Sequence, residues 1–424
     1  MERNDSYKPS GIPWLKEIPA HWQTRKIRSL YALRSEKVSD KDYEPLSVSK
    51  QGVTPQLEDA VKTDNGDNRK LVRKGDFVVN SRSDRKGSCG VSEFDGSVSV
   101  INIVTYPIAD FDSRYFHLMF RSNDYIEEFY RLGKGIVADL WTTKFDEMRN
   151  ISVPFPPREE QEKIVEFLST KTLQIDAQQR ERERELRLLD ELKQAEIANV
   201  VTRGLNPNAP LRDTNIPWLP KIPVHWQTPK FYHLFDFIGG HGFPIHLQGK
   251  QSGDYPFYKT SDINGDEIYI EKSSNYLSED DLAKNSFTLI PSGAFLMSKI
   301  GAALRKNHRK ITTCQCFIDN NLQALVRKPT NQENELYLFY FLKFFDMAWV
   351  DNNGTIPCVD NGKLRICIFP VPPLEEQKAI VEYIQQKNKA IDEMIANLRA
   401  EIDFLTEYKQ RLIADAVTGQ LKID

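Results

Sequence analysis

Two stretches of the sequence place Arg and Lys beside Ser, Asn and Gly. They read NRKLVRKGDFVVNSRSDRKGS at 68–88 and SKIGAALRKNHRK at 298–310. Arg and Lys on loops suit contacts with phosphate oxygens, and an Arg can donate two parallel hydrogen bonds to the edge of a guanine. The alternative is that each stretch is an ordinary solvated loop. The candidate DNA contacts are Arg69, Lys70, Lys74, Arg82, Arg85, Lys86, Lys299, Arg305, Lys306, His308 and Arg309.

The other groups that could carry chemistry are isolated. The loop DFIGGHGF at 236–243 resembles a glycine-rich adenosylmethionine loop, but its spacing differs and the companion Asn/Asp-Pro-Pro-Tyr/Phe motif is missing. His241 and His246 have no further metal ligand, and Cys314 and Cys316 have no second Cys or His pair at zinc-site spacing. Phosphate-loop, H-E-x-x-H and G-x-S-x-G motifs do not occur. We expect no catalytic residue, no metal and no cofactor bound by this chain.

The elements that would position the basic stretches are duplicated along the chain. IPWLKEIPAHWQTRK at 12–26 returns as IPWLPKIPVHWQTPK at 216–230, and PPREEQEKIVEFL at 156–168 returns as PPLEEQKAIVEYI at 372–384. Repeated blocks in the same order indicate two copies of one structural unit. We expect two tandem halves that meet near residue 205.

Each half also carries a glycine turn followed by an apolar strand, close to its basic stretch. The two copies are LVRKGDFVVNSR at 71–82 and LIPSGAFLMSKI at 289–300. Because the same local element accompanies both basic stretches, the sequence favours equivalent positions for them over two unrelated solvated loops.

A long helix is expected at the end of each half. Acidic residues directly after a Pro pair suit the first turn of a helix, and neither Gly nor Pro interrupts 158–203 or 374–418. About 45 residues at about 1.5 Å each give a helix of about 65–70 Å. Apolar residues spaced close to 3.5 apart predict a coiled-coil seam: Ile391, Ile395, Leu398, Ile402, Leu405 and Leu412.

The corresponding seam of the first helix is partly polar, because Gln179 and Arg182 fall on it. One interpretation is a solvated stretch of helix, and the other is a polar contact that fixes the register or binds a partner protein. The apolar positions of this seam are Ile175, Leu186, Leu189 and Leu192.

The segments before the long helices have the pattern of mixed domains. Short β-branched and aromatic runs alternate with Gly, Asn and Asp turns, and helical stretches follow at 113–132 and 333–350. We predict an α+β fold, with two tandem globular domains joined by two long antiparallel coiled-coil helices in a pseudo-twofold internal repeat. The predicted segments are a first globular domain at 1–155, its helix at 156–205, a second globular domain at 206–370 and its helix at 371–424.

A Trp- and Pro-rich stretch opens each half. We expect it to seat each globular domain against the helices, and we expect His21 and His225, which are equivalent in the two copies, to serve packing. The Trp residues at the two equivalent junctions are Trp14, Trp22, Trp218 and Trp226.

Composition sets the remaining limits. A chain of 424 residues with 40% apolar residues suits at least two domains, and its net charge of −3 leaves the basic charge local to the two stretches. Five Cys are few and odd in number, which favours reduced thiols over a disulfide framework. Because no run of 18 apolar residues occurs, we expect a soluble, cytoplasmic protein without a membrane contact.

The repeated blocks, with helices ending VVTRGL and AVTGQL, make the chain similar to the DNA-specificity subunit of Type I restriction-modification systems. The resemblance covers nearly the whole chain. It implies that the globular domains are target-recognition domains, each reading one half of a split asymmetric site in double-stranded DNA, with the helices as spacer. It also implies two methyltransferase subunits and restriction-translocase subunits as partners, which would use S-adenosylmethionine, ATP and Mg while this chain stays non-catalytic.

Two other functions fit parts of the same pattern. One is the specificity subunit of a Type IIB-like restriction enzyme, which differs in its partner. The other is a coiled-coil scaffold that joins proteins without binding DNA, which leaves the two Arg-rich stretches unexplained.

Overall fold

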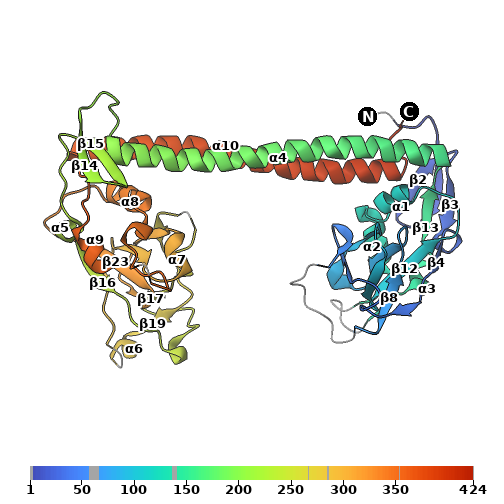
Figure 1. Ribbon diagram of the computed structural model, residues 1–424, viewed down its shortest axis with the longest axis horizontal. Helices are drawn as coiled ribbons and strands as arrows, with labels where there is room; N and C mark the ends of the chain where they lie inside the picture. Colours follow the sequence, from blue (N-terminus) through green and yellow to red (C-terminus); the bar gives the residue numbers. More distant parts are fainter. Residues whose placement is uncertain are drawn as a thin grey trace. The chain divides into compact units, whose positions relative to one another are not determined.

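The computed structural model of the protein describes residues 3–56, 66–135, 141–265, 267–283, 286–352 and 354–423 (Figure 1). The chain divides into two compact units, and each combines a β-rich domain with a part of both long helices. The first unit is Met1–Arg184 with Leu398–Asp424, and the second is Glu185–Asn397.

The two long helices have the predicted extent. Helix α4 spans Arg158–Arg203 and helix α10 spans Leu374–Val417, and each begins directly after a Pro pair. Just beyond their last turns, Gly204 and Gly419 have φ angles of +74° and +75°, the left-handed conformation that ends many helices. Proline at the start and glycine at the end therefore define both helices.

The first unit is built around an antiparallel sheet in the order β10-β9-β12-β4. Its strands and helices are β1 Tyr7–Ile12, β2 Leu15–Pro19, β3 Gln23–Lys26, β4 Tyr31–Leu33, β5 Lys37–Val38, β6 Leu46–Ser49, β7 Gly52–Pro55, β8 Arg69–Val72, β9 Phe77–Asn80, β10 Cys89–Val91, β11 Gly96–Ser99, β12 Asn102–Pro107, α1 Ser113–Met119, α2 Asn123–Arg131, α3 Phe145–Met148 and β13 Ser152–Phe155.

The second unit repeats that sheet in the order β21-β20-β23-β16, with β18 added in parallel beside β21. Its strands and helices are β14 Leu211–Ile216, β15 Leu219–Pro223, α5 Phe231–Leu234, β16 Phe235–Gly239, β17 Tyr255–Tyr258, β18 Tyr269–Ile270, β19 Tyr276–Leu277, α6 Glu279–Ala283, β20 Phe295–Ser298, α7 Ala302–Arg305, β21 Arg309–Thr312, β22 Phe317–Ile318, β23 Leu322–Arg327, α8 Glu335–Phe344 and α9 Asn361–Ile366.

The central strands β9 and β20 bury both faces, as the predicted apolar runs require. Phe77 and Val79 of β9 join the core shared with α1, α2 and the long helices, while Val78 points to a second cluster on the other face. Strand β20 does the same, with Phe295 in the core shared with α8 and the long helices and Leu296 in a separate cluster. The predicted α+β fold with an internal repeat is confirmed.

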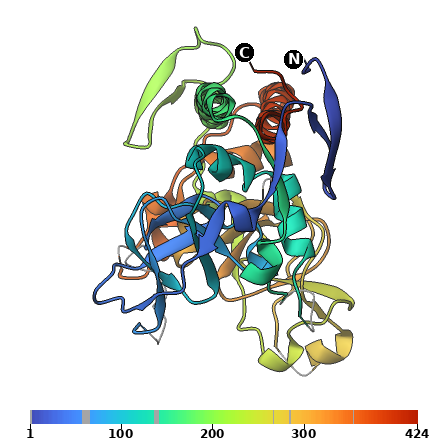
Figure 2. The same cartoon turned by 90° about the vertical axis from the view of Figure 1, so that its right-hand side faces the viewer.

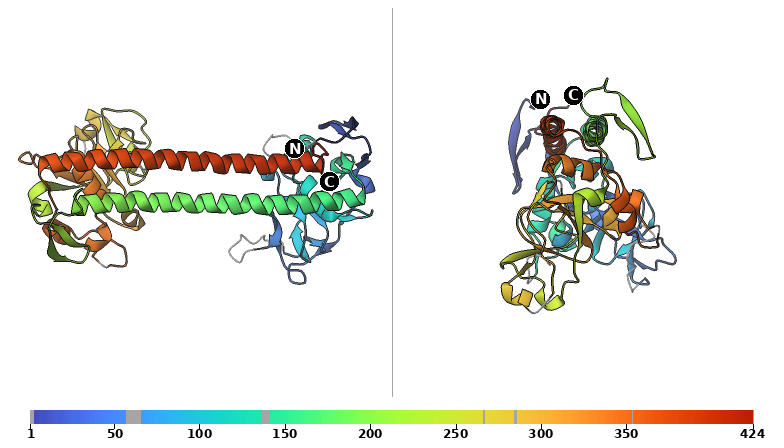
Figure 3. Two further views of the ribbon diagram at one scale, coloured as in Figure 1. Left: turned by 90° about the horizontal axis from the view of Figure 1, so that it is seen from above. Right: turned by 90° about the vertical axis from the view of Figure 1, so that its left-hand side faces the viewer.

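Within each unit, α4 and α10 run antiparallel side by side (Figure 3). In the first unit Asp176 Oδ1 accepts from Lys409 Nζ at 2.5 Å, and Gln179 Nε2 donates to Thr406 Oγ1 at 2.7 Å. In the second unit Lys193 Nζ donates to Asp392 Oδ1 at 2.6 Å. The two Lys–Asp pairs occupy equivalent positions of the repeat.

The polar seam positions of α4 contact α10 and are not a merely solvated stretch. Besides Gln179, Arg182 Nε lies 3.0 Å from Glu401 Oε1. The predicted seam of α10 is buried at Ile391, Ile395 and Leu412 and half-buried at Leu398, Ile402 and Leu405. The seam assigned to Leu192 is wrong, because that side chain is 46% exposed while the adjacent Lys193 faces α10.

The Trp- and Pro-rich stretches form hairpins that lie against the last turns of a long helix. Hairpin β1–β2 lies beside the end of α10, where Gln420 Nε2 donates to Glu17 O at 3.0 Å (Figure 2). Trp22, directly after this hairpin, is 1% exposed in a core with Ile164 and Val417, and Trp226 is 2% exposed in a core with helix residues from α4 and α10. These two Trp pack a β-rich domain onto the helices of its own unit.

The remaining Trp pair packs on helical segments of the domains. Trp14 meets Tyr125 of α2 edge-on at 6.3 Å between ring centroids. Trp218 stacks on Trp349 at 4.8 Å, with the ring planes 7° apart. The His residues of the same stretch each reach the first turn of a long helix, with His21 Nε2 2.9 Å from a Glu160 carboxylate oxygen.

A buried Gln locks each long helix to its domain in the same way. Gln161 Oε1 accepts from the backbone of Asp112 at 2.8 Å and its Nε2 donates to Pro156 O at 2.9 Å. Gln377 Oε1 accepts from the backbone of Asn334 at 2.7 Å, and its Nε2 donates to a Pro carbonyl. Among the described residues, no helix is long and apolar enough to cross a membrane.

Candidate nucleic-acid interface

The two basic stretches end in equivalent loops of the two sheets. The first basic loop, 81–88, joins β9 to β10, and the second basic loop, 299–308, joins β20 to β21. Each preceding strand follows a glycine with positive φ, +92° at Gly75 and +78° at Gly293. The local repeat seen in the sequence therefore places the two loops at equivalent ends of the equivalent central strands β9 and β20.

Each loop is fastened by a later segment through the same pair of backbone hydrogen bonds. We call residues 141–143 the first strap and residues 357–359 the second strap. In the first, Thr143 N donates to Ser81 O and Ser83 N donates to Trp141 O, both at 2.9 Å. In the second, the equivalent bonds run from Val359 N to Lys299 O at 2.9 Å and from Gly301 N to Pro357 O at 2.8 Å.

Three cations of the first basic loop are accessible. Arg82 forms a two-pronged pair with Asp84, Nε to Oδ1 at 3.0 Å and Nη2 to Oδ2 at 3.2 Å. Arg85 is the most exposed, at 68% of its side chain, and lies 3.8 Å from the same carboxylate. Lys86 Nζ reaches Glu127 Oε2 at 2.8 Å. Exposed ion pairs of this kind are weak, so phosphates can compete for these cations.

The other three candidates of the first stretch lie away from the loop. Arg69 is 5% exposed on β8 and its guanidinium donates to Ser97 Oγ and O at 2.8 and 2.9 Å. Lys70 Nζ donates to Asn102 O at 2.7 Å, and burial lowers the pKa of both Arg69 and Lys70. Lys74 is exposed, but it precedes β9 and so lies at the opposite end of that strand from the first basic loop.

The second basic loop exposes Arg305 and Lys306 and leaves Lys299 half-buried. Arg309, on β21, is 1% exposed, and its guanidinium donates to His308 O at 2.8 Å and Phe345 O at 3.3 Å. Burial lowers the pKa of Arg309 to about 9. The side chain of Arg309 thus holds strand β21 to the end of α8, and His308 is half-buried.

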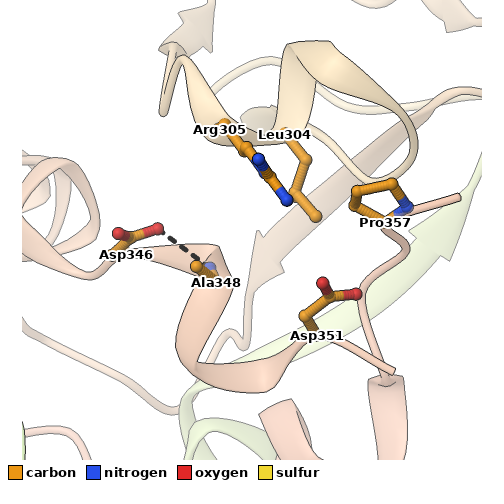
Figure 4. Close-up of a pocket in the computed structure, with 6 residues that line it drawn as sticks. All are labelled: Leu304, Arg305, Asp346, Ala348, Asp351 and Pro357. Carbon is orange, nitrogen blue, oxygen red and sulfur yellow. Dashed lines mark hydrogen bonds between the residues drawn. The ribbon is translucent and has the colours of Figure 1, made fainter. Parts of the chain in front are cut away.

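Arg305 lies on the rim of a small pocket of about 290 Å³ (Figure 4). Two carboxylates, Asp346 and Asp351, line it together with Leu304 and Pro357. Each carboxylate also accepts a backbone hydrogen bond, Asp346 from Ala348 and Asp351 from Cys358. The pocket lining therefore combines one guanidinium with two carboxylates that accept backbone hydrogen bonds.

A larger groove of about 1350 Å³ runs beside the second basic loop within the second unit. The loop contributes Arg305, Lys306 and His308, α8 contributes aromatic side chains, and α4 and α10 form the other side. Charged residues of both signs line it, including Lys193, which is paired with Asp392. The groove leaves the loop accessible on the side facing the helices of its own unit.

The glycine-rich stretch 236–243 has a packing role. Strand β16 ends in it, and a Cβ at Gly240 would lie 2.0 Å from Asp319 O, so only glycine allows this approach. His241 Nε2 accepts a hydrogen bond from Thr288 N at 3.1 Å. Burial raises the pKa of the Cys316 thiol, and the described part of the chain contains no cluster of metal-ligating residues.

The straps were missed by the sequence reasoning, together with the exposed Trp141 beside Arg82. Trp141 is 38% exposed, and its ring is available beside the loop that its carbonyl fastens. The signal that could have found the straps is their spacing, because residues 141–143 and 357–359 are separated by the same interval as the two long helices.

Comparison with known proteins identifies the fold and a family domain in the second half of the chain. The family model for the Type I restriction modification DNA specificity domain matches residues 223–403. The Type I restriction enzyme MjaVIII specificity subunit of Methanocaldococcus jannaschii is 23% identical over 282 residues, which cover 65% of this chain and 63% of the relative. This chain thus aligns with less than two thirds of that relative's length, and with 61% of another from the same organism.

Two solved structures share the fold. One, from a study of complex assembly and conformational transition of the type I R-M system, has a TM-score of 0.68 at 17% identity and covers 95% of this chain and 99% of that chain. The HsdS subunit from Thermoanaerobacter tengcongensis has a TM-score of 0.52 at 18% identity, covering 95% and 98%. The chain thus matches the Type I restriction modification DNA specificity domain over residues 223–403, shares its fold with these two solved structures, and is similar to Type I restriction-modification specificity subunits.

Proposed function

We propose that this chain reads a bipartite, asymmetric site in double-stranded DNA, with one half-site for each β-rich domain. The observation that carries the proposal is the pair of strapped basic loops at the same end of equivalent strands. The scaffold around the loops is the same in both units, while the loop sequences differ. A duplicated support with two different loops suits two different half-sites.

The first half-site is assigned to Arg82, Arg85 and Lys86 and the second to Lys299, Arg305 and Lys306. Arg69, Lys70 and Arg309 are excluded from direct contact because their polar ends are engaged inside the domain. Lys74 lies at the other end of its strand, and the half-buried His308 serves at most the rim of the second loop. Fewer residues are therefore proposed as DNA contacts than the composition of the two basic stretches alone suggests.

The chain directs chemistry that its partners perform. In this proposal it assembles with two methyltransferase subunits, and with restriction-translocase subunits in the full complex, which bind S-adenosylmethionine, ATP and Mg. The paired helices act as the spacer, so that the length of the paired segment sets the number of unread base pairs between the half-sites. The repeat of the Lys–Asp pairs supports equivalent partner positions on the two halves.

The test is co-expression with a methyltransferase subunit from the same genome, followed by mapping of methylated bases across a genome. We expect one split motif with a fixed spacer, absent when this chain is omitted. The double substitution Arg85→Ala with Lys86→Ala should weaken one half-site only, and Arg305→Ala with Lys306→Ala the other. Loss of both half-sites from either variant, in a folded protein, would contradict the assignment of one loop to each half-site.

Assays of DNA cleavage and of DNA retention on the same co-expressed complex decide between the alternatives. A Type IIB-like enzyme gives a split motif too, but its methyltransferase partner carries the nuclease, so cleavage occurs without a separate translocase. A coiled-coil scaffold gives no motif and no DNA retention although the partner still binds. The strapped basic loops favour DNA reading over the scaffold.

A further inference from the structure

We propose that Arg82 is the base-reading residue of the first basic loop, that it contacts a guanine, and that Asp84 is the positioning residue that aims it. This inference rests on the proposed DNA-reading function and names the base that one residue selects.

The Arg82–Asp84 pair uses one edge of the guanidinium and leaves another edge free. Nε and Nη2 of Arg82 donate to the two oxygens of Asp84 at 3.0 and 3.2 Å. The remaining hydrogens, on Nη1 and Nη2, form a second parallel fork. Such a fork matches O6 and N7 of guanine in the major groove, which is the commonest specific contact of arginine with a base. Arg82 remains 40% exposed, so that edge is open to a ligand.

The backbone under Arg82 is held from both sides. Arg82 N donates to Asn80 Oδ1 at 3.1 Å, and Arg82 forms an antiparallel β-bridge with Thr142 of the first strap. The buried Tyr130 hydroxyl lies 2.8 Å from Asn80 O and 3.2 Å from Arg85 O, and its single proton is shared between these two carbonyl acceptors. A long side chain on a fixed backbone, already oriented by a carboxylate, loses less conformational freedom on binding than a free one.

Neither neighbouring cation combines a guanidinium fork with a carboxylate at hydrogen-bond distance. Arg85 lies 3.8 Å from Asp84 at its closest and is 68% exposed, and Lys86 ends in a point charge near the exposed Glu127. An ammonium point charge and a guanidinium without a close carboxylate suit phosphate contacts, which tolerate a range of geometries and carry no base information. The loop thus combines one oriented fork with two cations that lack one.

The test measures base preference at every position of the first half-site, using the co-expressed complex and a library with that half-site randomised. Arg82→Ala should lower the preference for guanine at a single position by about tenfold to a hundredfold. Arg82→Lys should lower it nearly as much, because lysine cannot form the fork. Asp84→Ala should relax the same position, and adding it to Arg82→Ala should cause no further loss.

The second half-site gives an internal control for folding and assembly in every variant. Arg73→Ala is the matched control, because Arg73 also pairs with an exposed carboxylate, Asp95, but precedes β9 at the other end of the strand. It should leave all base preferences unchanged.

Two results would overturn the inference. If Asp84→Ala raised affinity for all sequences equally, the carboxylate would mask a phosphate-binding Arg82 instead of aiming it. If Arg82→Ala left every base preference intact and only reduced the salt dependence, Arg82 would be a phosphate contact. Both results leave a split motif in place, whereas failure of the proposed function removes the motif from the wild-type complex itself.

Discussion

The first and second basic loops have equivalent supports but different exposed side chains. Both follow the central strand of an equivalent sheet and both are fastened by the same two backbone bonds from a strap. The first loop then carries the Arg82–Asp84 fork, while the second forms helix α7 and places Arg305 over a pocket lined by Asp346 and Asp351. Burial and backbone pairing fix the support, and only the exposed loop side chains are free to differ.

The largest effect is expected where the two halves are most alike, at the buried junction Trp residues. Trp22→Ala and Trp226→Ala should each lower the free energy of unfolding by about 3–5 kcal/mol, because each leaves a cavity beneath a long helix. Chemical denaturation followed by circular dichroism measures the loss.

Replacing the same two Trp residues by Phe tests whether the hydrogen bond of Trp226 contributes to stability. Trp226 Nε1 donates to Glu376 Oε1 at 3.2 Å, whereas the buried Nε1 of Trp22 has no partner among the described residues. Trp226→Phe should therefore cost about 0.5–1.5 kcal/mol more than Trp22→Phe. Equal losses would mean that the Trp226 hydrogen bond contributes nothing to stability.

Acid should destabilise the first unit more than the second. His117 of α1 accepts a hydrogen bond from Val91 N at 3.1 Å, and burial, with the nearby charge of Arg121, lowers the pKa of His117 to about 4. The corresponding position of α8 holds Phe339. The folded state resists protonation that the unfolded chain accepts near pH 6.5, so stability is full above about pH 6.5 and falls by up to about 3 kcal/mol as the pH approaches 4.

Denaturation of the wild type and of His117→Asn between neutral pH and about pH 5 checks this prediction. Asn can still accept the Val91 hydrogen bond but does not titrate, so its stability should depend less on pH. Hydrogen exchange should show that the first unit opens before the second as the pH falls. Identical pH dependence of the two proteins would remove His117 as the cause.

The buried Gln locks should fail equally in both halves. Gln161→Ala leaves the buried N–H of Asp112 and a buried Pro carbonyl without their side-chain partner, and Gln377→Ala leaves the half-buried N–H of Asn334 and a buried Pro carbonyl without theirs. The expected loss is about 1–3 kcal/mol for each variant. Gln178→Ala, at an exposed position of α4, is the control and should change stability little.

The long helices and the central strands could be predicted because their signals are local, and the repeat could be predicted because its blocks recur in the same order. Pro before 158 and 374, apolar spacing along α10, and Gly before β9 and β20 each act within a few residues. Which of the Arg and Lys side chains are buried and which are exposed could not be predicted in this way. Arg69 is buried by Ser97 of a partner strand and Arg309 by the end of α8, and both contacts join residues distant in sequence.

The same limit applies to the straps and the polar seam. The first basic loop is closed by residues some sixty positions later, so no window of sequence around 81–88 contains its fastening. Gln179 and Arg182 could be recognised as polar seam positions, but their partners lie on the other helix of the repeat. Contacts between segments distant in sequence, and not local secondary-structure propensity, therefore decide which polar residues have a structural role.

The smallest effect is expected from the Lys–Asp pairs of the helices, and it tests the equivalence of the two halves most directly. Lys409 with Asp176 and Lys193 with Asp392 are the same pair in the two copies, at 2.5 and 2.6 Å, and all four side chains remain partly exposed. Reversing one charge, as in Asp176→Lys or Asp392→Lys, should cost at most about 1 kcal/mol, and exchanging both members of a pair should restore most of it.

Double-mutant cycles in low and high salt measure both couplings. Because salt screens exposed charges, each coupling should shrink as salt is added. Gln179 and Arg182 follow Asp176 along the first helix, whereas the equivalent Ile395 and Leu398 follow Asp392. If the polar seam fixes the register of α4 against α10 in the first unit, the Lys409–Asp176 coupling should weaken when Gln179 is replaced by Ala. The Lys193–Asp392 coupling, beside an apolar seam, should depend on no such polar neighbour.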